Sequence, residues 1–475
     1  MFVGRRQEIQ ELKALLTLKK SSFVVIKGRR RIGKSTLVRM FSRDCSHFYE
    51  FAGLAPSDKT TAITQKMEFT QLLARQGIPG VDSQDWSDIF WHLAQVVKKK
   101  RTVIFLDEIS WMADKDETFL AKLKNAWDLY FSREDKIILI VCGSISSWID
   151  KNLLSHSGFL GRVDLELTLK ELSLTDCQQF FQSRKTQLST LDKISLLSVT
   201  GGVPRYLEDI RPNDTAENNL LRMCFKSSGL LFNEFDKIFH DLFDKRAPLY
   251  KKILSSLIKG PQSLQTLLDD MHINKSGIYS DYLNDLVTAG FVSRDYTWNL
   301  NNGALRNLSR YRIRDNYVRF YLKYIEPHKQ QIIKGDFAAS LLAKLPQWST
   351  IMGLQFENLI LANRQHIFKY LSLVPEDILN DGPFYQTKTK LQEGCQIDFL
   401  IHTKSRNLFV CEIKRSSTMI TKSIVDEVAK KIKLLKIPRF FSVRPVLIFC
   451  GQIDPELYEL DFFDKIISAD DLLNN

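Results

Sequence analysis

The chain has 475 residues, which is too long for one hydrophobic core, so roughly two to four domains are expected. Its 67 Lys and Arg residues exceed its 55 Asp and Glu residues, and the net charge of +12 favours an anionic partner without naming one. Seven scattered cysteines and eight dispersed histidines include no C-x-x-C pair, which argues against a disulfide framework and a zinc site. Without a signal peptide or an apolar run of membrane length, a cytoplasmic protein with no membrane segment is expected.

The first motif is a glycine loop between an expected strand and an expected helix. Residues 22–27 form an apolar run typical of a buried strand, and residues 35–41 begin a helix. The segment between them, KGRRRIGKST, matches the phosphate-binding pattern G-x-x-x-x-G-K-[ST]. In this pattern the loop amides face the phosphates of a nucleotide, Lys34 reaches the outer two phosphates and the Ser35 hydroxyl ligates Mg2+. The residues expected to contact ATP here are Gly28, Arg31, Ile32, Gly33, Lys34, Ser35 and Thr36.

Three consecutive arginines, Arg29 to Arg31, occupy the variable positions of this loop. Only the two glycines need backbone freedom or close approach, so the arginine side chains are free to point outward. Two interpretations stay open. The arginines form a solvated basic loop, or they contact nucleotide, a neighbouring subunit or DNA.

Two further strands are expected to end in polar residues. The run RTVIFLDE, residues 101–108, predicts a buried strand whose Asp107 holds the Mg2+ shell while Glu108 polarises the attacking water. The acidic pair favours ATP hydrolysis over a nucleotide kinase, although an acidic helix start is the simpler alternative. Residues 136–142 predict a third strand, after which Ser144 is expected to sense the terminal phosphate. Because all three strands carry their chemistry at one end, we expect an open parallel α/β sheet with the nucleotide at that edge.

These segments together resemble a known group of ATPases. The FVGR segment near the start, the GRRRIGKS loop, the FLDE strand and the stretch TGGVPRYL at residues 200–207 are similar to the archaeal-type AAA+ ATPases of the wider STAND group. The likeness covers about the first half of the chain and implies a P-loop core followed by a helical lid. It also implies that Phe2 and Val3 contact the adenine and that Pro204 approaches the nucleotide from the lid.

The resemblance further implies that Arg162 reaches the γ-phosphate. From the residues alone, a surface arginine at a helix end is an equal alternative for Arg162, and Gly201 and Gly202 read as a loop before a helix. Whether an arginine acts within its own subunit or across the interface of a homo-oligomer stays open.

The middle of the chain predicts a winged helix-turn-helix. Amphipathic helices are expected at residues 248–259, 263–271 and 275–289, followed by a strand pair that begins at residues 291–292. If this element binds DNA, its third helix would enter the major groove through Asn274, Lys275, Ser276 and Tyr279. The surface is only weakly basic, so a nucleotide lid or a protein contact is the alternative.

Residues 311–324, YRIRDNYVRFYLKY, are rich in aromatic and basic residues. Stacking on bases is one interpretation, but Tyr317, Phe320, Tyr321 and Tyr324 have helical spacing and are expected in a core. The segment looks like the one that links a winged helix to the C-terminal domain in the subgroup with a restriction-endonuclease-like tail. A boundary is expected near residues 345–348.

The tail carries a second acidic constellation. The expected strand QIDFLI bears Asp398, and after 13 intervening residues the expected strand ending in CEIK bears Glu412 and Lys414. Side chains alternate along a strand, so Glu412 and Lys414 are expected on one face. Asp398 and Glu412 would share a divalent cation, while Lys414 would position the water or steady the developing charge. A salt-bridged hairpin is the simpler alternative.

This arrangement closely resembles the core of PD-(D/E)XK nucleases, although no proline precedes Asp398. The resemblance implies a metal-binding acid on the preceding helix, for which Glu357 is the candidate. A version of the fold that binds DNA without cutting it stays open. Residues 404–436 hold nine Lys or Arg against three acids, which is compatible with a surface that follows a phosphate backbone or with a solvated helix face.

The expected organisation is an ATPase core at residues 1–170, a helical lid at 171–240, a winged helix-turn-helix with a linker helix at 241–330, and an α/β nuclease-like domain at 345–475. The leading hypothesis is an ATPase that uses ATP and Mg2+, binds DNA and carries a metal-dependent DNase tail under nucleotide control. The alternative is a STAND-type signalling or scaffold ATPase whose C-terminal domain binds DNA or protein without cutting it.

Overall fold

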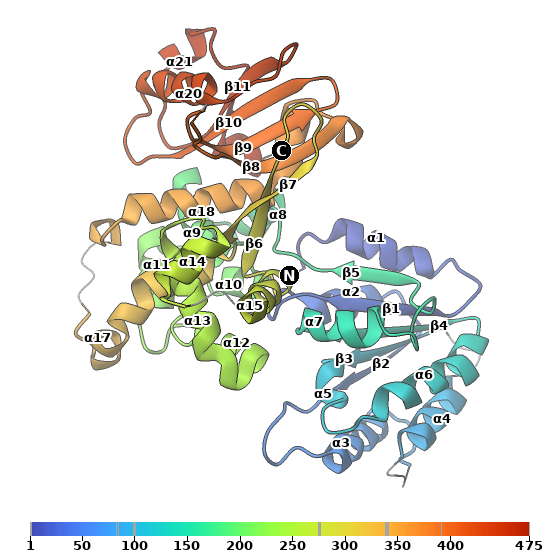
Figure 1. Ribbon diagram of the computed structural model, residues 1–475. Coiled ribbons are helices and arrows are strands. Elements are labelled where there is room, and N and C mark those ends of the chain that lie inside the picture. Colours follow the sequence, from blue (N-terminus) through green and yellow to red (C-terminus); the bar gives the residue numbers. More distant parts are fainter. Residues whose placement is uncertain are drawn as a thin grey trace. The chain divides into compact units, whose positions relative to one another are not determined.

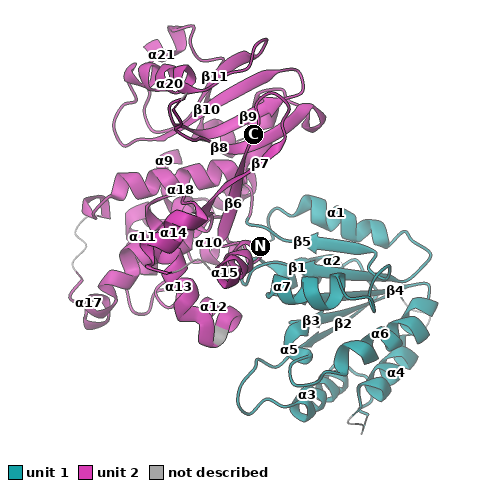
Figure 2. Cartoon of the chain, viewed as in Figure 1, with its two compact units in different colours: residues 1–171 teal, residues 172–475 magenta. Residues whose placement is uncertain are grey.

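The computed structural model describes residues 2–474 except residues 82, 84, 98–100, 274–276, 338–341 and 391. The chain forms two compact units, residues 1–171 and residues 172–475, which Figure 2 shows in different colours. Within the described parts, no helix has the length and apolar character needed to cross a membrane.

Unit 1 is built on a five-stranded sheet with the order β2-β3-β4-β1-β5, and all its neighbouring strands are parallel (Figure 1). The strands are β1 (Ser22–Lys27), β2 (His47–Ala52), β3 (Thr102–Asp107), β4 (Ile137–Gly143) and β5 (Leu165–Thr168). The three strands expected from apolar runs, β1, β3 and β4, are adjacent, and their buried residues form continuous runs. Such runs are typical of parallel strands covered on both faces. The predicted parallel sheet is confirmed.

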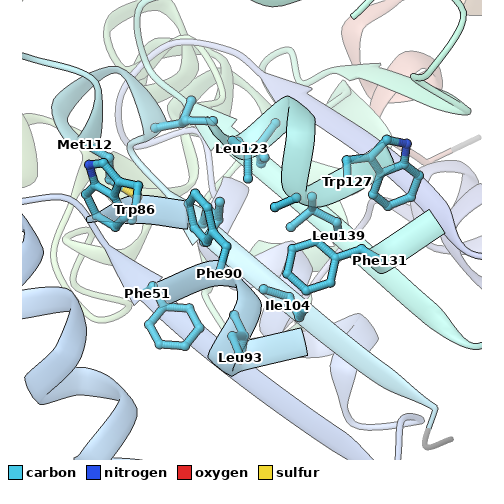
Figure 3. Packing of buried hydrophobic residues seen from close by; sticks show 14 of the residues in the cluster. Phe51, Trp86, Phe90, Leu93, Ile104, Met112, Leu123, Trp127, Phe131 and Leu139 are labelled. Carbon is cyan, nitrogen blue, oxygen red and sulfur yellow. The ribbon is translucent and has the colours of Figure 1, made fainter. Parts of the chain in front are cut away.

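Helices cover this sheet and form a hydrophobic core with it. They are α1 (Arg6–Leu15), α2 (Lys34–Ser42), α3 (Ala62–Arg75), α4 (Trp86–Val97), α5 (Ile109–Met112), α6 (Phe119–Leu129) and α7 (Ser146–Ile149). Figure 3 shows Trp86 and Phe90 of α4 and Trp127 of α6 packed with Ile104 of β3 and Leu139 of β4. This core fixes β3 and β4, and therefore the positions at which their carboxyl ends place polar side chains.

Unit 2 begins with helices and a hairpin. The helices are α8 (Leu174–Ser183), α9 (Thr190–Thr200), α10 (Pro204–Glu208), α11 (Ala216–Cys224), α12 (Glu234–Phe243), α13 (Ala247–Ser256), α14 (Leu264–Asp270) and α15 (Gly277–Thr288). Strands β6 (Val292–Trp298) and β7 (Leu305–Ile313) form an antiparallel pair. The three expected helices and the strand pair are thus present in the expected order. Asn274, Lys275 and Ser276, expected to contact DNA, lie outside the described residues, and Tyr279 is half-buried on α15.

The segment after the hairpin is core, as its aromatic spacing predicts. It contains α16 (Asn316–Phe320) and a π-helical turn (Tyr321–Ile325). Tyr317, Phe320, Tyr321 and Tyr324 are each no more than 1% exposed. Because these rings are buried, they cannot stack on nucleic-acid bases, and that alternative is excluded.

The rest of unit 2 is a mixed five-stranded sheet with flanking helices, in the order β12-β11-β10-β9-β8. Strands β8, β9 and β10 are antiparallel neighbours, whereas β10, β11 and β12 are parallel. The strands are β8 (Ile378–Gln386), β9 (Cys395–Thr403), β10 (Asn407–Arg415), β11 (Ser442–Cys450) and β12 (Lys465–Ser468). The helices are α17 (Lys329–Lys334), α18 (Trp348–Ala362), α19 (Arg364–Tyr370), α20 (Ser423–Leu434), α21 (Glu456–Glu459) and α22 (Ala469–Asn474). The tail thus follows the order helix, three antiparallel strands, helix, strand.

Candidate functional site

The glycine loop lies between β1 and α2, as its spacing predicts. Gly28 and Gly33 have φ values of 149° and 93°, and a Cβ on Gly28 would lie 2.6 Å from the carbonyl oxygen of Leu169. Glycine adopts these φ values without strain, and at position 28 it also avoids the close contact with Leu169. The backbone therefore requires glycine at both ends of the motif. Ile32 is fully buried beneath the loop, whereas Thr36 is exposed.

The ammonium group of Lys34 lies over this loop. Lys34 is 6% exposed, and its Nζ donates to the carbonyl oxygens of Gly28, at 2.9 Å, and of Arg29, at 3.2 Å. A buried positive charge that donates to neutral carbonyls is suited to an anionic ligand, because a bound phosphate would bring the negative charge that compensates for the burial of the ammonium group.

Ser35 and Asp107 meet at the carboxyl edge of the sheet. The Ser35 hydroxyl donates to Asp107 Oδ2 at 2.6 Å, and Asp107 Oδ1 accepts from the Glu108 amide, at 3.0 Å, and from Cys142 Sγ, at 2.7 Å. A hydroxyl and a carboxylate side by side are the hard oxygen ligands that Mg2+ prefers. These two side chains therefore fit the expected magnesium site next to the phosphate loop.

Glu108 is held by the residue expected to sense the terminal phosphate. Glu108 has a φ of 51°, and its Oε2 accepts from both the amide and the hydroxyl of Ser144, each at 3.0 Å. The two residues come from the ends of the neighbouring strands β3 and β4. Ser144 therefore fixes the direction of the carboxylate that is expected to act on water.

Two of the three loop arginines contact other residues of unit 1. Arg29 forms an ion pair with Glu171 at 3.5 Å, and its side chain is 9% exposed. The guanidinium of Arg30 lies 6.0 Å from the centre of the Trp111 ring. The interpretation as a solvated basic loop therefore fails for Arg29, which is part of the loop's own packing.

Arg5 is a residue of this site that the motifs did not single out. It is 8% exposed, and its Nη2 donates to the carbonyl oxygens of Ile32, at 3.1 Å, and of Lys170, at 2.5 Å, while Nη1 donates to Glu8 at 3.1 Å. Arg5 thus ties the glycine loop to the chain that follows β5. Its place in the FVGR segment is the signal in the sequence, although the family resemblance points to its apolar neighbours Phe2 and Val3.

Three residues implied by the family resemblance stay predictions. Phe2 and Val3 are half-buried just before α1. Arg162 donates to both carboxylate oxygens of Asp128, at 2.7 and 2.9 Å, so a role at the γ-phosphate requires this pair to open.

Pro204, the fourth such residue, lies in unit 2 as the first residue of α10. The turn before it needs glycine, because a Cβ on Gly202, where φ is 78°, would lie 2.8 Å from the Leu172 carbonyl oxygen. The approach of Pro204 to the nucleotide stays a prediction as well.

In unit 2 the two predicted acids on neighbouring strands face one cation. Lys431 of α20 places Nζ 2.5 Å from Glu412 Oε2 and 3.5 Å from Asp398 Oδ1. Asp398 Oδ2 also accepts from the Ile413 amide at 3.2 Å. Burial and the charge of Asp398 raise the pKa of Glu412 to about 7, while Lys431 opposes the rise. Both acids were predicted from the sequence, but Lys431 was not. This lysine lies on a helix, outside the E-x-K pattern.

Lys414, the lysine of that pattern, has another partner. Its Nζ lies 3.0 Å from Glu427 Oε2, and its side chain is 39% exposed. A catalytic role of Lys414 stays a prediction, whereas the ammonium that touches both acids in this structure belongs to Lys431.

Glu357 of α18 belongs to the same electrostatic group. Burial and the charge of Asp398 raise its pKa to about 8, Arg319 and Arg312 oppose the rise, and Glu412 adds to it. Among the described residues, however, no three His, Cys, Asp or Glu side chains gather closely enough to hold a metal ion. Glu357, Asp398 and Glu412 therefore do not form a preformed metal site. Two of them, Asp398 and Glu412, face the ammonium group of Lys431 instead.

Comparisons with known proteins cover from less than half to about 70% of the chain. Residues 2–210 match a family model described as an ATPase domain predominantly from Archaea. An uncharacterized protein of Methanocaldococcus jannaschii is 26% identical over 341 residues, which are 71% of this chain and 72% of that protein. The Walker-type ATPase of Pyrococcus abyssi, 16% identical, covers 68% of this chain and 96% of its own with a TM-score of 0.51. The Aeropyrum pernix ORC2 protein, 15% identical, covers 69% of this chain and 93% of its own with a TM-score of 0.43. Residues 2–210 are therefore similar to an archaeal-type ATPase domain, and the likeness to the Pyrococcus abyssi structure agrees with the α/β fold of unit 1.

Proposed function

We propose that the protein hydrolyses ATP with Mg2+ and binds DNA, and that its C-terminal domain cuts DNA with a divalent cation under control of the nucleotide state. The proposal rests on the presence of two oxygen-rich sites in one chain. Ser35 and Asp107 form the first site, and Asp398 and Glu412 form the second.

For ATP hydrolysis, bound ATP and Mg2+ supply the phosphoryl group and a divalent charge. On the protein side, Lys34 provides positive charge for the phosphates, and Ser35 and Asp107 hold the cation. Glu108 polarises the attacking water, and Ser144 keeps its carboxylate in place. The ATPase family match supports this assignment.

For DNA cleavage, Asp398 and Glu412 would hold the cation and Lys431 would carry positive charge beside them. The order of helix, three antiparallel strands, helix and parallel strand supports a restriction-endonuclease-like domain. Three helices followed by a hairpin support the winged helix-turn-helix. DNA is the proposed anionic partner, in keeping with the net charge of +12.

A second candidate is a STAND-type signalling or scaffold ATPase whose tail binds DNA or protein without cutting. The ion pairs of Lys431 favour it, because an ammonium that neutralises both acids already provides the charge a metal would bring. Binding of Mn2+ that depends on Asp398 separates the candidates, since a purely structural ion pair needs no metal.

The ATPase assignment is tested with Lys34→Ala and Asp398→Asn in the full chain. We expect Lys34→Ala to lower ATP hydrolysis by about 100-fold or more, because it removes the charge that stabilises the phosphates. Asp398→Asn should leave ATP hydrolysis unchanged. Equal losses in both variants would contradict separate sites.

The nuclease assignment is tested by incubating linear, circular and single-stranded DNA with Mg2+ or Mn2+, with and without ATP. We expect cleavage by the wild type that Asp398→Asn and Glu412→Ala abolish. The matched control is Asp381→Asn, because Asp381 lies on the neighbouring strand β8 and pairs with Arg364 at 2.9 Å, away from the acids on β9 and β10. Binding without cutting in every condition would favour the second candidate.

A further inference from the structure

A cavity of about 220 Å³ lies within unit 2, between the hairpin and the C-terminal sheet. Its lining includes residues of β6, β7, β8 and the segment after α20, namely Trp298, Arg306, Phe384, Tyr385 and Lys436. Pockets for drug-sized ligands measure about 300–1,000 Å³. This cavity is therefore suited to a smaller group, such as one planar ring.

Two buried polar atoms of this lining have no partner. Trp298 and Tyr385 are 2% and 3% exposed, and within the described part of the chain neither Trp298 Nε1 nor Tyr385 Oη forms a hydrogen bond. A buried donor without a partner is unfavourable, and an indole N–H can only donate. The Phe384 ring lies edge-on to Trp298, with 5.1 Å between the ring centres. A pyrimidine base suits this lining, because it is planar and carries carbonyl oxygens that accept hydrogen bonds.

Hydrogen bonds join the walls of the cavity. Gln386 Nε2 donates to the Leu434 carbonyl oxygen at 2.7 Å, and its Oε1 accepts from the Lys436 amide at 2.8 Å. Thr297 Oγ1 donates to the Tyr385 carbonyl oxygen at 3.0 Å and so ties β6 to β8. The cavity is therefore preformed, which lowers the cost of ordering the site when a ligand binds.

The charge of the lining favours an anionic ligand. Among the described residues that line the cavity, Arg306 and Lys436 are cationic and none is acidic. Both side chains are exposed, as is that of the nearby Arg439. Cations beside a cavity that fits one base are suited to the phosphates on either side of that base.

Phe440 adds an exposed ring two residues beyond the cavity lining. Its neighbours Ile437 and Phe441 pack against the core of the C-terminal sheet, whereas Phe440 is 86% exposed, the most of any large apolar side chain in the described residues. Its φ of 64° is rare for a bulky residue. An exposed ring on an anchored segment, next to cations, is suited to stack on a base of a single strand.

We propose that the cavity holds one unpaired base of a DNA strand, that Arg306 and Lys436 contact the neighbouring phosphates, and that Phe440 stacks on the next base. This inference rests on the DNA binding proposed above and requires no metal. It assigns single-stranded DNA to a surface separate from the third helix of the winged helix-turn-helix. A single strand fits better than a duplex, because a paired base must leave the stack before it can enter a cavity.

The test is binding of a labelled oligothymidine strand, and of a duplex of the same length, to the full chain with EDTA present, measured by fluorescence anisotropy. We expect the strand to bind more tightly than the duplex. Phe440→Ala should weaken strand binding by about 10-fold through lost stacking. Tyr385→Phe should weaken it by about 5-fold, because it removes only the hydroxyl. Lys436→Gln should reduce the slope of log affinity against log salt by about 0.7.

Two variants serve as matched controls and should leave strand binding unchanged. Tyr458→Ala removes another exposed ring, which is 60% exposed on α21, beyond the opposite end of β11. Tyr324→Phe removes another buried hydroxyl, which donates to the Pro346 carbonyl oxygen at 3.1 Å. Phe440→Ala changes only an exposed side chain, so it tests the site in a folded protein even if Tyr385→Phe does not fold.

The outcomes separate the site from the wider proposal. Strand binding that is unchanged in Phe440→Ala, Tyr385→Phe and Lys436→Gln, or weaker than duplex binding, would overturn the site and leave DNA binding in place. Competition by dTMP at the concentration of the strand would assign the cavity to a free nucleotide and overturn the DNA strand as its ligand. Binding of neither DNA by the wild type would overturn the proposed DNA binding, and the site with it.

Discussion

Two carboxylates of unit 2 share a lysine that lies on a helix rather than on their own strands. Burial lowers the pKa of the Lys431 ammonium, but the charges of Asp398 and Glu412 outweigh this effect, so its pKa is raised. The proximity of the two acids was predictable because strand pairing fixes which residues are neighbours. The position of Lys431 was not, because it depends on how α20 packs against β9, and the sequence contains no pattern that reports this packing.

Replacing Lys431 with methionine should tighten Mn2+ binding by about 10-fold, since a charge-assisted bond to the acids no longer competes with the metal. The metal-free protein should become less stable, because two partly buried carboxylates lose their counter-charge. Calorimetry and thermal unfolding with and without Mn2+ measure both effects. Lys430→Met is the control, since Lys430 is the exposed neighbour on the same helix. Weaker Mn2+ binding by Lys431→Met would instead assign this lysine a supporting role for the metal.

Elements were predictable where one physical signal dominated. Apolar runs identified β1, β3 and β4, and the glycine loop with its lysine identified the start of α2. The element that anchors the loop was less evident. Arg5 precedes α1 in a left-handed conformation with a φ of 59°, and this backbone turn points its side chain to carbonyls far along the chain. A hydrogen bond between residues so far apart in the sequence produces no local sequence pattern from which it could be predicted.

Arg5→Ala should therefore loosen the glycine loop. Two carbonyl oxygens, of Ile32 and Lys170, would lose their donor, at a cost of about 1–3 kcal/mol in the free energy of unfolding of unit 1. We expect ATP affinity to fall by about 10-fold, because part of the loop's preorganisation is lost. Nucleotide titration and denaturant unfolding of the same preparation check both values. Arg6→Ala, at the exposed neighbouring position, should change neither, and an equal effect in both variants would refute the anchoring role.

At the scale of the molecule, the hairpin and the C-terminal sheet share a core. Trp298 of β6 is 2% exposed and packs in one cluster with Phe384, Ile397, Leu400 and Leu408. At the turn, Asn380 Nδ2 donates to the Gly303 carbonyl oxygen at 2.8 Å. Sequence composition places a boundary near residues 345–348, but it cannot reveal that a residue on an earlier strand fills part of the core of the later sheet.

This shared core predicts how unit 2 tolerates truncation. A fragment of residues 345–475 lacks Trp298, so it would expose the apolar side chains of Phe384 and Leu400 to water. We expect it to aggregate or stay unfolded, whereas a fragment of residues 172–475 folds, as judged by circular dichroism and sedimentation.

The same core makes Trp298 a sensitive position in the longer fragment. Trp298→Ala should lower the free energy of unfolding by about 3–5 kcal/mol, because it removes a large buried side chain and leaves a cavity. Urea unfolding of residues 172–475 measures the loss. As a control in the full chain, Trp91→Ala should stay within about 0.5 kcal/mol, because Trp91 is 50% exposed. A small effect of Trp298→Ala, together with a stable fragment of residues 345–475, would instead establish the C-terminal sheet as an independent folding unit, with the hairpin only resting on it.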